Sequence, residues 1–320
     1  MGKKTKIEWC DATFSPWRGC QKVSKSCENC YADAFSHRNP KLLGVFGTEA
    51  QGGTRVVASD DMWQQPLKWN AKRTSRVFCA SIADVFDDWS GPMLNHKGEH
   101  LWNTDQRNVW RGAKCSYFKP VTMTDVRRRL FDLIDATPNL TWQLLTKRPE
   151  NIRRMLFGSI PKLATALKHE VGTPEANIWH RPNCWLGTTV ENQECADKRV
   201  PELLKCSDMA PVLFLSMEPL LGPVDMENVN HNYQGGGYMI DAVKGLHGVS
   251  SGPHINWIIV GCESGAHRRE TKIEWVIDLR DQCKAAGVAF FVKQLEIDGK
   301  VTADINQFPE DLRIQEFPNQ

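Results

Sequence analysis

The sequence predicts an α/β fold, a full or partial TIM-like (β/α) barrel with long loop insertions. Three observations support this prediction. Short apolar segments alternate with helix-like segments from about residue 76 onward, the apolar segments are largely continuous, and no glycine-rich dinucleotide fingerprint follows an early strand. Continuous apolar runs are typical of strands covered on both faces, and a repeated strand–helix order implies a parallel sheet with right-handed crossovers.

Six candidate strands are rich in Val, Ile, Phe and Trp. They span residues 76–81, 140–146, 183–189, 211–217, 256–262 and 288–294. With a further strand ahead of Cys20, six or seven strand–helix units are available. An open, doubly wound sheet is the alternative that the missing dinucleotide fingerprint disfavours.

Four helices are expected between these strands. The helix at 122–138 begins at a Thr cap and ends before Pro138, and the helix at 148–158 has Pro149 in its first turn. Two more helices are expected at 192–206 and at 272–287, the latter closing on Gly287.

We expect one domain over residues 1–320, interrupted by two insertions. Residues 88–120 and 225–255 carry Gly, Asn, His and Trp without clear periodicity. Loops of this length are usually functional lids or disordered. Both would leave from the carboxyl ends of strands, the face where TIM-like barrels hold their active sites.

Bulk composition excludes several classes of protein. The formal charge of +2 gives no global field for nucleic acid, and no stretch of about 18 apolar residues predicts a membrane span. The first ten residues show no secretory signal. Eleven cysteines cannot all pair, so we expect free thiols and a cytoplasmic location.

Three of these cysteines lie within the segment GCQKVSKSCENCYA, as Cys20, Cys27 and Cys30. A structural zinc site needs four ligands, and Cys10 or His37 could supply the fourth. Three thiolates alone are the set that a [4Fe–4S] cluster uses when one iron stays open. Zinc, a cluster and unligated thiols all remain possible from the spacing.

At this point the chain resembles the phage Gp37/Gp68 family, a radical S-adenosylmethionine (radical SAM) group. The resemblance rests on GCQKVSKSCENCYA, SIADVFD, LLTKRP, WLGTTVEN, FLSMEPLLGP, IIVGCESG and GVAFFVKQ, and runs from about residue 5 to the C-terminal FPEDLRIQEFP. It implies a radical SAM barrel, with Cys20, Cys27 and Cys30 as ligands of a [4Fe–4S] cluster that binds S-adenosylmethionine. The chain departs from the commonest pattern, with six residues between the first two cysteines and Asn29 before the third.

The resemblance also suggests residues for the cofactor. Ser81 and Asp84 suit the methionyl ammonium, although Asp84 could instead cap a turn. Lys147 and Arg148 suit the methionyl carboxylate or a substrate phosphate, with a surface salt bridge as the alternative. Further expected contacts are the ribose hydroxyls with Thr188, Thr189 and Glu191, and adenine with the backbone near Gly261.

Three residues at strand ends are candidates for catalysis. Glu218 and Glu263 follow apolar strands and suit binding of a substrate amine or proton transfer. Cys262 offers a thiol that could donate a hydrogen atom or bind a second cluster, against the simpler interpretation of a buried spectator. A role of Cys10 in a second metal site also stays open.

The resemblance implies an isomerase or mutase that rearranges an amino-acid-modified thymidine in phage DNA (hypermodification). The basic run within residues 127–154 could receive phosphates, and loop tryptophans could stack a splayed base. Such an enzyme needs an external one-electron reductant and would work in the host cytoplasm. The alternatives are a radical SAM enzyme acting on a peptide or small metabolite, and a non-catalytic zinc or cluster binding module.

Overall fold

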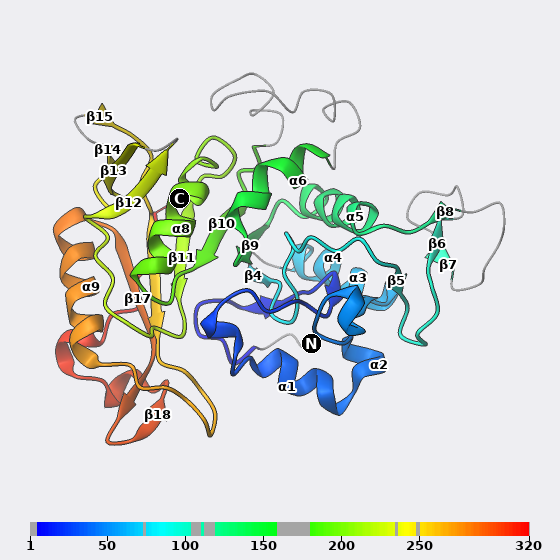
Figure 1. The fold of residues 1–320 in the computed structure, drawn as a ribbon, viewed down its shortest axis with the longest axis horizontal. Helices are drawn as coiled ribbons and strands as arrows, with labels where there is room; N and C mark the ends of the chain where they lie inside the picture. Colours follow the sequence, from blue (N-terminus) through cyan, green and yellow to red (C-terminus); the bar gives the residue numbers. More distant parts are fainter. Residues whose placement is uncertain are drawn as a thin grey trace. The chain divides into compact units, whose positions relative to one another are not determined.

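The computed structural model describes residues 5–72, 75–103, 110–111, 119–158, 180–233, 236–247 and 250–319. The chain divides into two compact units, drawn in Figure 1. The first unit comprises residues 1–144 and 153–169, and the second unit comprises residues 145–152 and 170–320.

The first unit is organised on three parallel strands. β4 (Ser75–Cys79) pairs with β1 (Ala12–Thr13) on one side and with β9 (Leu140–Thr146) on the other. A second sheet joins β2 (Trp17–Arg18), β3 (Arg55–Val57) and β5 (Met93–Leu94). The other described elements of this unit are α1 (Tyr31–Arg38), α2 (Pro40–Leu43), α3 (Asp60–Trp63), α4 (Gln65–Asn70), α5 (Met123–Asp135), α6 (Ile152–Gly158), β6 (Trp102–Asn103), β7 (Trp110–Arg111) and β8 (Lys119–Pro120), with the 3-10 helices η1 (Lys25–Cys27) and η2 (Glu49–Gln51).

The second unit has four parallel strands in chain order. β10 (Cys184–Thr189), β11 (Leu213–Met217), β16 (Trp257–Gly261) and β17 (Ala289–Ile297) pair each with the next. Every residue of the first three strands is buried, which explains their continuous apolar runs. Their helices are α8 (Gln193–Leu204) and α9 (Ile273–Ala286), and the unit also holds β18 (Lys300–Thr302), η3 (Pro149–Asn151), η4 (Ile305–Gln307) and η5 (Glu310–Leu312).

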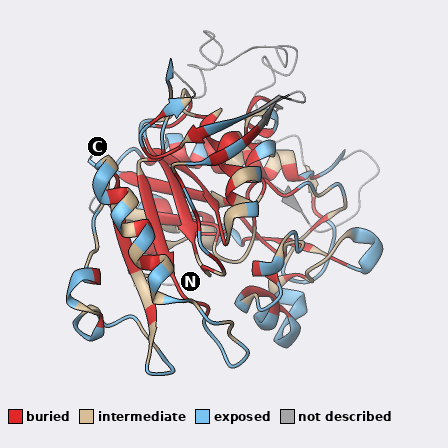
Figure 2. Cartoon of the chain, turned by 60° about the vertical axis from the view of Figure 1, so that its left-hand side comes forward, coloured by how far each residue is buried: buried red, intermediate tan, exposed pale blue. Residues whose placement is uncertain are grey.

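Aromatic side chains fill the core of the second unit. The fully buried Trp257 lies 5.8 Å from the rings of both Trp185 and Phe214, and 5.3 Å from that of Phe317. Gly187 gives Phe214 its space, because a Cβ there would stand 2.5 Å from the ring. Figure 2 shows the strands as buried and the outward faces of their helices as exposed.

The order and type of the main elements confirm the prediction. The six expected strands appear as β4, β9, β10, β11, β16 and β17, with ends shifted by up to three residues. The expected caps also form. Thr122 makes a capping box with Asp125 at the start of α5, and Gly287 ends α9 with a φ of 71°.

The predicted TIM-like barrel, however, is wrong. The strand order is β1-β4-β9-β10-β11-β16-β17-β18, so that among the described strands β1 and β18 lie at opposite ends. β18 also runs antiparallel to β17, whereas a TIM barrel closes eight parallel strands. The reversal follows from Asp298 and Gly299, whose positive φ values of 48° and 74° suit a two-residue hairpin turn. The fold is therefore mixed α/β with an eight-stranded, mostly parallel sheet.

The structure describes more of the insertion at residues 225–255 than of the insertion at residues 88–120. Residues 225–255 form an antiparallel sheet of β12 (Val229–Tyr233), β13 (Gly236–Asp241), β14 (Leu246–His247) and β15 (Ser250–Ser251), rather than an aperiodic loop. Within 88–120, residues 104–109 and 112–118 lie outside the described part of the chain. In the part of the chain with described structure, no helix has the length and apolarity to cross a membrane.

A buried guanidinium organises the first unit. Arg55 is fully buried and donates from Nε to Asp87 Oδ2 at 2.7 Å. Its Nη1 also donates to the carbonyls of Thr54 and Gly47, at 3.0 and 3.3 Å. Because Gly47 in turn donates its backbone N–H to Cys20 O at 2.9 Å, this guanidinium supports the backbone of the first cysteine.

Replacing Arg55 by Met leaves the Asp87 carboxylate buried without its cation, so we expect a loss of about 3–5 kcal/mol in the free energy of unfolding. Arg76→Met is the matched control, since Arg76 forms a more exposed, 3.5 Å pair with Asp11 and should cost about 0–1 kcal/mol. Urea denaturation followed by tryptophan fluorescence measures both, and equal losses would contradict the role given to Arg55.

Candidate functional site

The cysteine loop lies between β2 and α1 of the first unit. Cys27 ends η1 and is 8% exposed, Cys30 is the N-cap residue of α1, and Cys20 is half-buried. Gly19, directly before the loop, has a φ of 97°, and a Cβ there would stand 2.3 Å from Thr54 O. The loop therefore starts at a position that only glycine can occupy without distortion.

The three thiols suit an iron–sulfur cluster by residue type alone. All ten described cysteines are free, which excludes disulfides among them. Lys22 has a raised pKa, first because it is hydrogen-bonded to Asp33 and to a smaller extent because Cys30 and Cys27 lie within electrostatic range. The described side chains nevertheless include no group of three or more His, Cys, Asp or Glu that could hold a metal ion. The thiols thus fit the cluster in kind, without converging on one point.

Two further predicted residues lie in the first unit. The backbone carbonyl of Ser81 accepts a 2.5 Å hydrogen bond from the hydroxyl of Tyr31, which ties the start of α1 to the end of β4. Asp84 is 5% exposed, and its Oδ1 accepts from the N–H of Phe86 at 2.9 Å. Asp84 therefore caps a turn, which is the alternative role that we expected for this residue from the sequence.

The carboxyl ends of β11, β16 and β17 bring a charged pair together in the second unit. Lys293 Nζ lies 3.3 Å from Glu218 Oε1, and the Ser216 hydroxyl donates to Glu218 Oε2 at 3.3 Å. Gly261 makes room for this carboxylate, because a Cβ there would stand 3.0 Å from Oε1. Gly261 thus makes space for the Glu218 carboxylate. The predicted contact between the backbone near Gly261 and adenine stays a prediction.

Cys262 follows Gly261 where the register between β16 and β17 shifts. Its carbonyl accepts from Gln294 Nε2 at 2.6 Å, and its N–H donates to Gln294 O at 3.2 Å. Burial, and to a smaller extent Glu296, raise the pKa of the thiol to about 11, although Lys293 acts to lower it. Near neutral pH this group is a neutral, 2% exposed S–H, as a hydrogen-atom donor would need to be.

Glu263 has its own cation. Arg269 donates to it from Nε at 3.0 Å and from Nη2 at 2.5 Å, in a forked pair, and its backbone N–H adds a third bond at 2.8 Å. Glu263 is 5% exposed, whereas the Arg269 side chain is 30% exposed. A substrate amine at Glu263 would therefore compete with a bound guanidinium.

The residues expected at the ribose are engaged with the protein itself. Thr188 is fully buried and donates to Thr146 O at 2.9 Å. Glu191 accepts from Arg199 at 2.7 Å, and the same guanidinium nitrogen donates to Thr189 O at 2.8 Å. The Thr188 bond joins β10 to β9, and the Arg199 contacts join the end of β10 to α8, which is a structural role.

Lys147 and Arg148 follow β9 at the start of η3. The Arg148 N–H donates to Thr146 Oγ1 at 2.9 Å, and the residue is 5% exposed. The Arg148 side chain is therefore largely covered by the protein. Contact with the methionyl carboxylate stays a prediction for both residues.

Four arginines of the basic run have partners within the first unit. Arg127 is 4% exposed and donates to the carbonyls of Val85 and Asp87. Arg129 pairs with Asp60 at 2.8 Å and lies 4.4 Å from the ring of Trp63. Arg128 and Arg154 pair with carboxylates at 3.3 and 3.4 Å. The support that this run lent to DNA binding is thereby reduced.

The sequence reasoning missed the cations Lys293, Arg269 and Arg199, and also Gln294. Lys293 and Gln294 come after the apolar segment Ala289–Val292 of β17, so the rule that selected Glu218 and Glu263 would have found them. Arg199 and Arg269 carry no comparable signal, because only folding brings them to their carboxylates.

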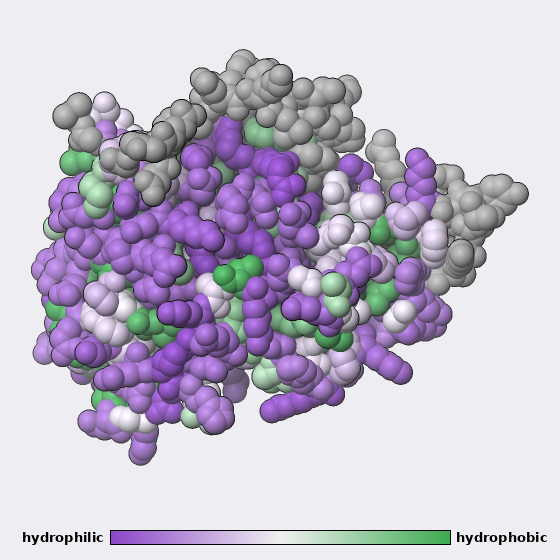
Figure 3. Space-filling model, in the orientation of Figure 1, coloured by the Kyte–Doolittle hydropathy of each residue, from purple (hydrophilic) through white to green (hydrophobic). Residues whose placement is uncertain are grey.

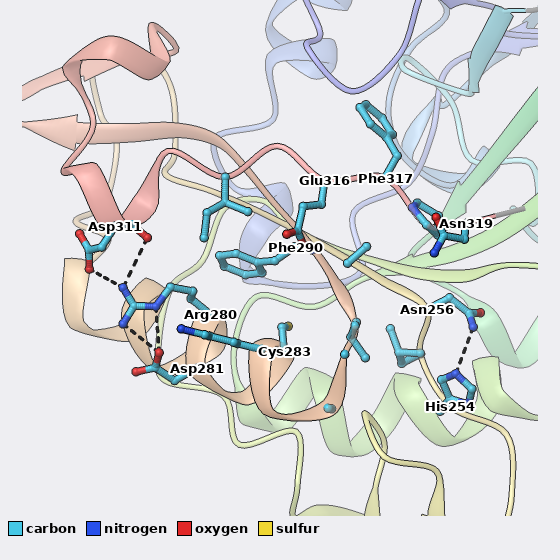
Figure 4. Close-up of a pocket in the computed structure, with 18 residues that line it drawn as sticks. His254, Asn256, Arg280, Asp281, Cys283, Phe290, Asp311, Glu316, Phe317 and Asn319 are labelled. Carbon is cyan, nitrogen blue, oxygen red and sulfur yellow. Dashed lines mark hydrogen bonds and ion pairs between the residues drawn. The ribbon is translucent and has the colours of Figure 1, made fainter.

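A cavity of about 990 Å³ lies at the opposite, amino ends of β16 and β17. Figure 4 shows Arg280 of α9 held between Asp281 and Asp311, and Asn256 bonded to His254. The charge of Arg280 is therefore already neutralised.

Another cavity, of about 1060 Å³ at the carboxyl end of β17, is lined by Glu270, Glu274, Glu296 and Asp298 among others. The predicted site residues line neither of these two cavities.

Gly261→Ala should force the Glu218 carboxylate away from its place, with a loss of about 1–3 kcal/mol in unfolding free energy from overpacking. The loss should shrink when Glu218 is also Ala, because the side chain that is crowded is gone. Gly222→Ala is the control, since its Cβ would meet only an ordinary 3.4 Å contact. Urea denaturation of the four variants measures the coupling, and additive losses would contradict the contact.

The buried thiols predict a pH dependence of stability. The pKa of Cys283 is raised by burial to about 12, well above the unfolded value near 9. The folded state therefore keeps its proton while the unfolded state loses it, so stability should fall as the pH rises from about 9 toward 12. Cys283→Ala should reduce this slope of the urea midpoint against pH; an unchanged slope would contradict the shift.

Comparison with known proteins gives one positive finding. A family model described as a protein of unknown function (DUF5131) matches residues 4–93 and 88–306. No curated protein and no solved structure gives a significant match. The family description states no activity, so the radical SAM resemblance stays a prediction. On this match over most of its length, the chain belongs to the DUF5131 family.

Proposed function

We propose that this protein is a radical SAM enzyme. The observation that carries the proposal is the loop that holds three cysteines, Cys20, Cys27 and Cys30, between β2 and α1. These three residues would hold the [4Fe–4S] cluster. When bound, a cluster with one open iron supplies the electron that cleaves S-adenosylmethionine and so starts hydrogen abstraction from the substrate.

Local charge supports thiolate ligands at this loop. Cys30 is the N-cap residue of α1, where the helix macrodipole favours a negative group. Lys22 adds an ammonium within electrostatic range of Cys27 and Cys30, and Asp33 holds it there at 2.8 Å. Both effects lower the free energy of the thiolate form that metal binding requires.

The second unit supplies groups for substrate and hydrogen transfer. Glu218 is 14% exposed and has the 20% exposed Lys293 beside it, so the pair can receive a group that carries both charges. Cys262 keeps its proton near neutral pH and can return a hydrogen atom. Glu191 is bound to Arg199 and fully buried, and we leave it out of the catalytic groups.

The resemblance makes an amino-acid-modified thymidine in phage DNA the first substrate to test, with an isomerase reaction in the host cytoplasm. A peptide or small metabolite is the alternative. A phosphate-binding surface on the basic run is disfavoured, because Arg127, Arg128, Arg129 and Arg154 have partners inside the protein.

Anaerobic reconstitution with iron and sulfide tests the proposal. The wild-type chain should bind about four iron atoms, as one [4Fe–4S] cluster requires, and should form 5′-deoxyadenosine from S-adenosylmethionine under dithionite. Cys27→Ala and Cys30→Ala should each lose cluster and cleavage. Cys195→Ala, a half-buried thiol of α8, should keep both.

Zinc in place of iron at these thiols, or a complete cluster without cleavage of S-adenosylmethionine, would reject the enzymatic proposal. The substrate is tested separately by mass spectrometry of nucleosides from modified phage DNA after turnover. Cleavage of S-adenosylmethionine with an unchanged nucleoside profile would reject the DNA substrate and leave the peptide or metabolite alternative.

A further inference from the structure

Arg18, at the end of β2, is a buried cation that the proposed function does not use. Figure 3 shows mainly hydrophilic residues on one face of the molecule, and the surface is where charged side chains ordinarily lie. Arg18 departs from this pattern, since it is only 7% exposed. A buried guanidinium is unfavourable unless a group of opposite charge compensates it. Arg18 therefore needs a counter-charge.

The contacts of Arg18 fix its position but supply no negative charge. Its Nη1 donates to the backbone carbonyl of Leu42 in α2 at 3.1 Å, and its Nη2 donates to the Sδ atom of Met62 in α3 at 2.7 Å. Both acceptors are neutral, and a thioether sulfur is a weak acceptor. Among the described residues, no carboxylate forms an ion pair with Arg18. The guanidinium is thus held between two helices, and its charge is left uncompensated.

Two other buried arginines of the first unit each have a carboxylate within reach. Arg55 pairs with Asp87 at 2.7 Å. Burial lowers the pKa of Arg127 to about 10, and the nearby Asp87 carboxylate acts to raise it. Burial also lowers the pKa of Arg18, but no carboxylate in the described part of the chain acts to raise it. The described residues thus compensate Arg55 and Arg127 and leave Arg18 to another source of negative charge.

The guanidinium of Arg18 still has N–H groups to offer. A guanidinium carries five N–H donors, and the bonds to Leu42 and Met62 use one on Nη1 and one on Nη2. The Nε of Arg18 makes no hydrogen bond to a described residue, and it is not sealed from solvent. A planar fork of N–H groups matches two oxygens of a phosphate or carboxylate. An oxyanion from solution can therefore reach Arg18 and supply the missing charge.

We propose that Arg18 anchors an anion-binding site between β2, α2 and α3, which takes a small oxyanion with two oxygens for the guanidinium fork. All three elements belong to the first unit. The site uses neither the thiols of the cysteine loop nor the charged pairs of the second unit, so this inference stands independently of the proposed function. A bound oxyanion should stabilise the folded state, because only folding holds the fork in place. Inorganic phosphate is the probe for this site.

Thermal unfolding of the whole chain tests the site. The melting temperature (Tm) is measured in phosphate and in chloride at equal pH and ionic strength, which keeps charge screening the same. Phosphate should raise the Tm of the wild type, because it binds the folded state. Arg18→Met should lose most of this increase. Arg128→Met is the matched control and should keep it, since the Arg128 side chain is 41% exposed and pairs with Asp125 at 3.3 Å.

Binding is measured directly from the broadening of the phosphorus NMR signal of inorganic phosphate when protein is added. The wild-type chain should broaden this signal. Arg18→Lys should bind phosphate about tenfold more weakly, because an ammonium keeps the charge but loses the fork. The lysine variant also covers the case in which Arg18→Met fails to fold. No broadening by the wild type, equal binding by the lysine variant, or an equal Tm increase in Arg18→Met would overturn the site.

Discussion

Strands that are buried on both faces have no room for charged side chains along their length, and this constraint places the chemistry of the second unit. β10, β11 and β16 are buried at every residue. Glu191, Glu218 and Glu263 come one or two residues after these strands end, where the backbone leaves the sheet. A carboxylate at such a place is still largely desolvated, so its charge must be compensated. The fold supplies a cation to each: Arg199, Lys293 and Arg269.

These three pairs are not equivalent. Arg199 and Glu191 are almost completely buried, so separating them would leave two charges without solvent or partner, and the pair is best suited to holding α8 on β10. Lys293 and Glu218 have greater access to solvent, and the Glu218 carboxylate lies against Gly261. A ligand can therefore replace the contact between Lys293 and Glu218 at a smaller cost in free energy than the contact between Arg199 and Glu191. The difference in burial, rather than the residue type, therefore distinguishes structural from candidate binding carboxylates.

The first unit holds a cysteine loop that has little regular structure of its own. Arg55 connects Asp87 to the carbonyl of Gly47, and Gly47 donates to Cys20 O. At the other end of the loop, Cys30 begins α1, and Tyr31 anchors that helix to Ser81. The loop is thus supported from both ends by residues distant in sequence, while its thiols stay free of disulfides. α1 meets this task with its polar face inward, which leaves Tyr31 and Phe35 exposed.

The six strands β4, β9, β10, β11, β16 and β17 and the caps of α5 and α9 were readable from the sequence, because apolar runs, Gly and Thr act through local backbone and burial preferences. The Asp298–Gly299 hairpin signal was readable too, and it argues against the full or partial TIM-like barrel that the strand–helix order suggested. The positions of Glu218 and Glu263 at strand ends were likewise predictable. Tertiary structure alone decided which cation meets each carboxylate, that Arg127 turns inward, and that α1 exposes its rings. Those outcomes depend on contacts between residues far apart in the chain, and no local pattern encodes a partner that only folding brings within reach.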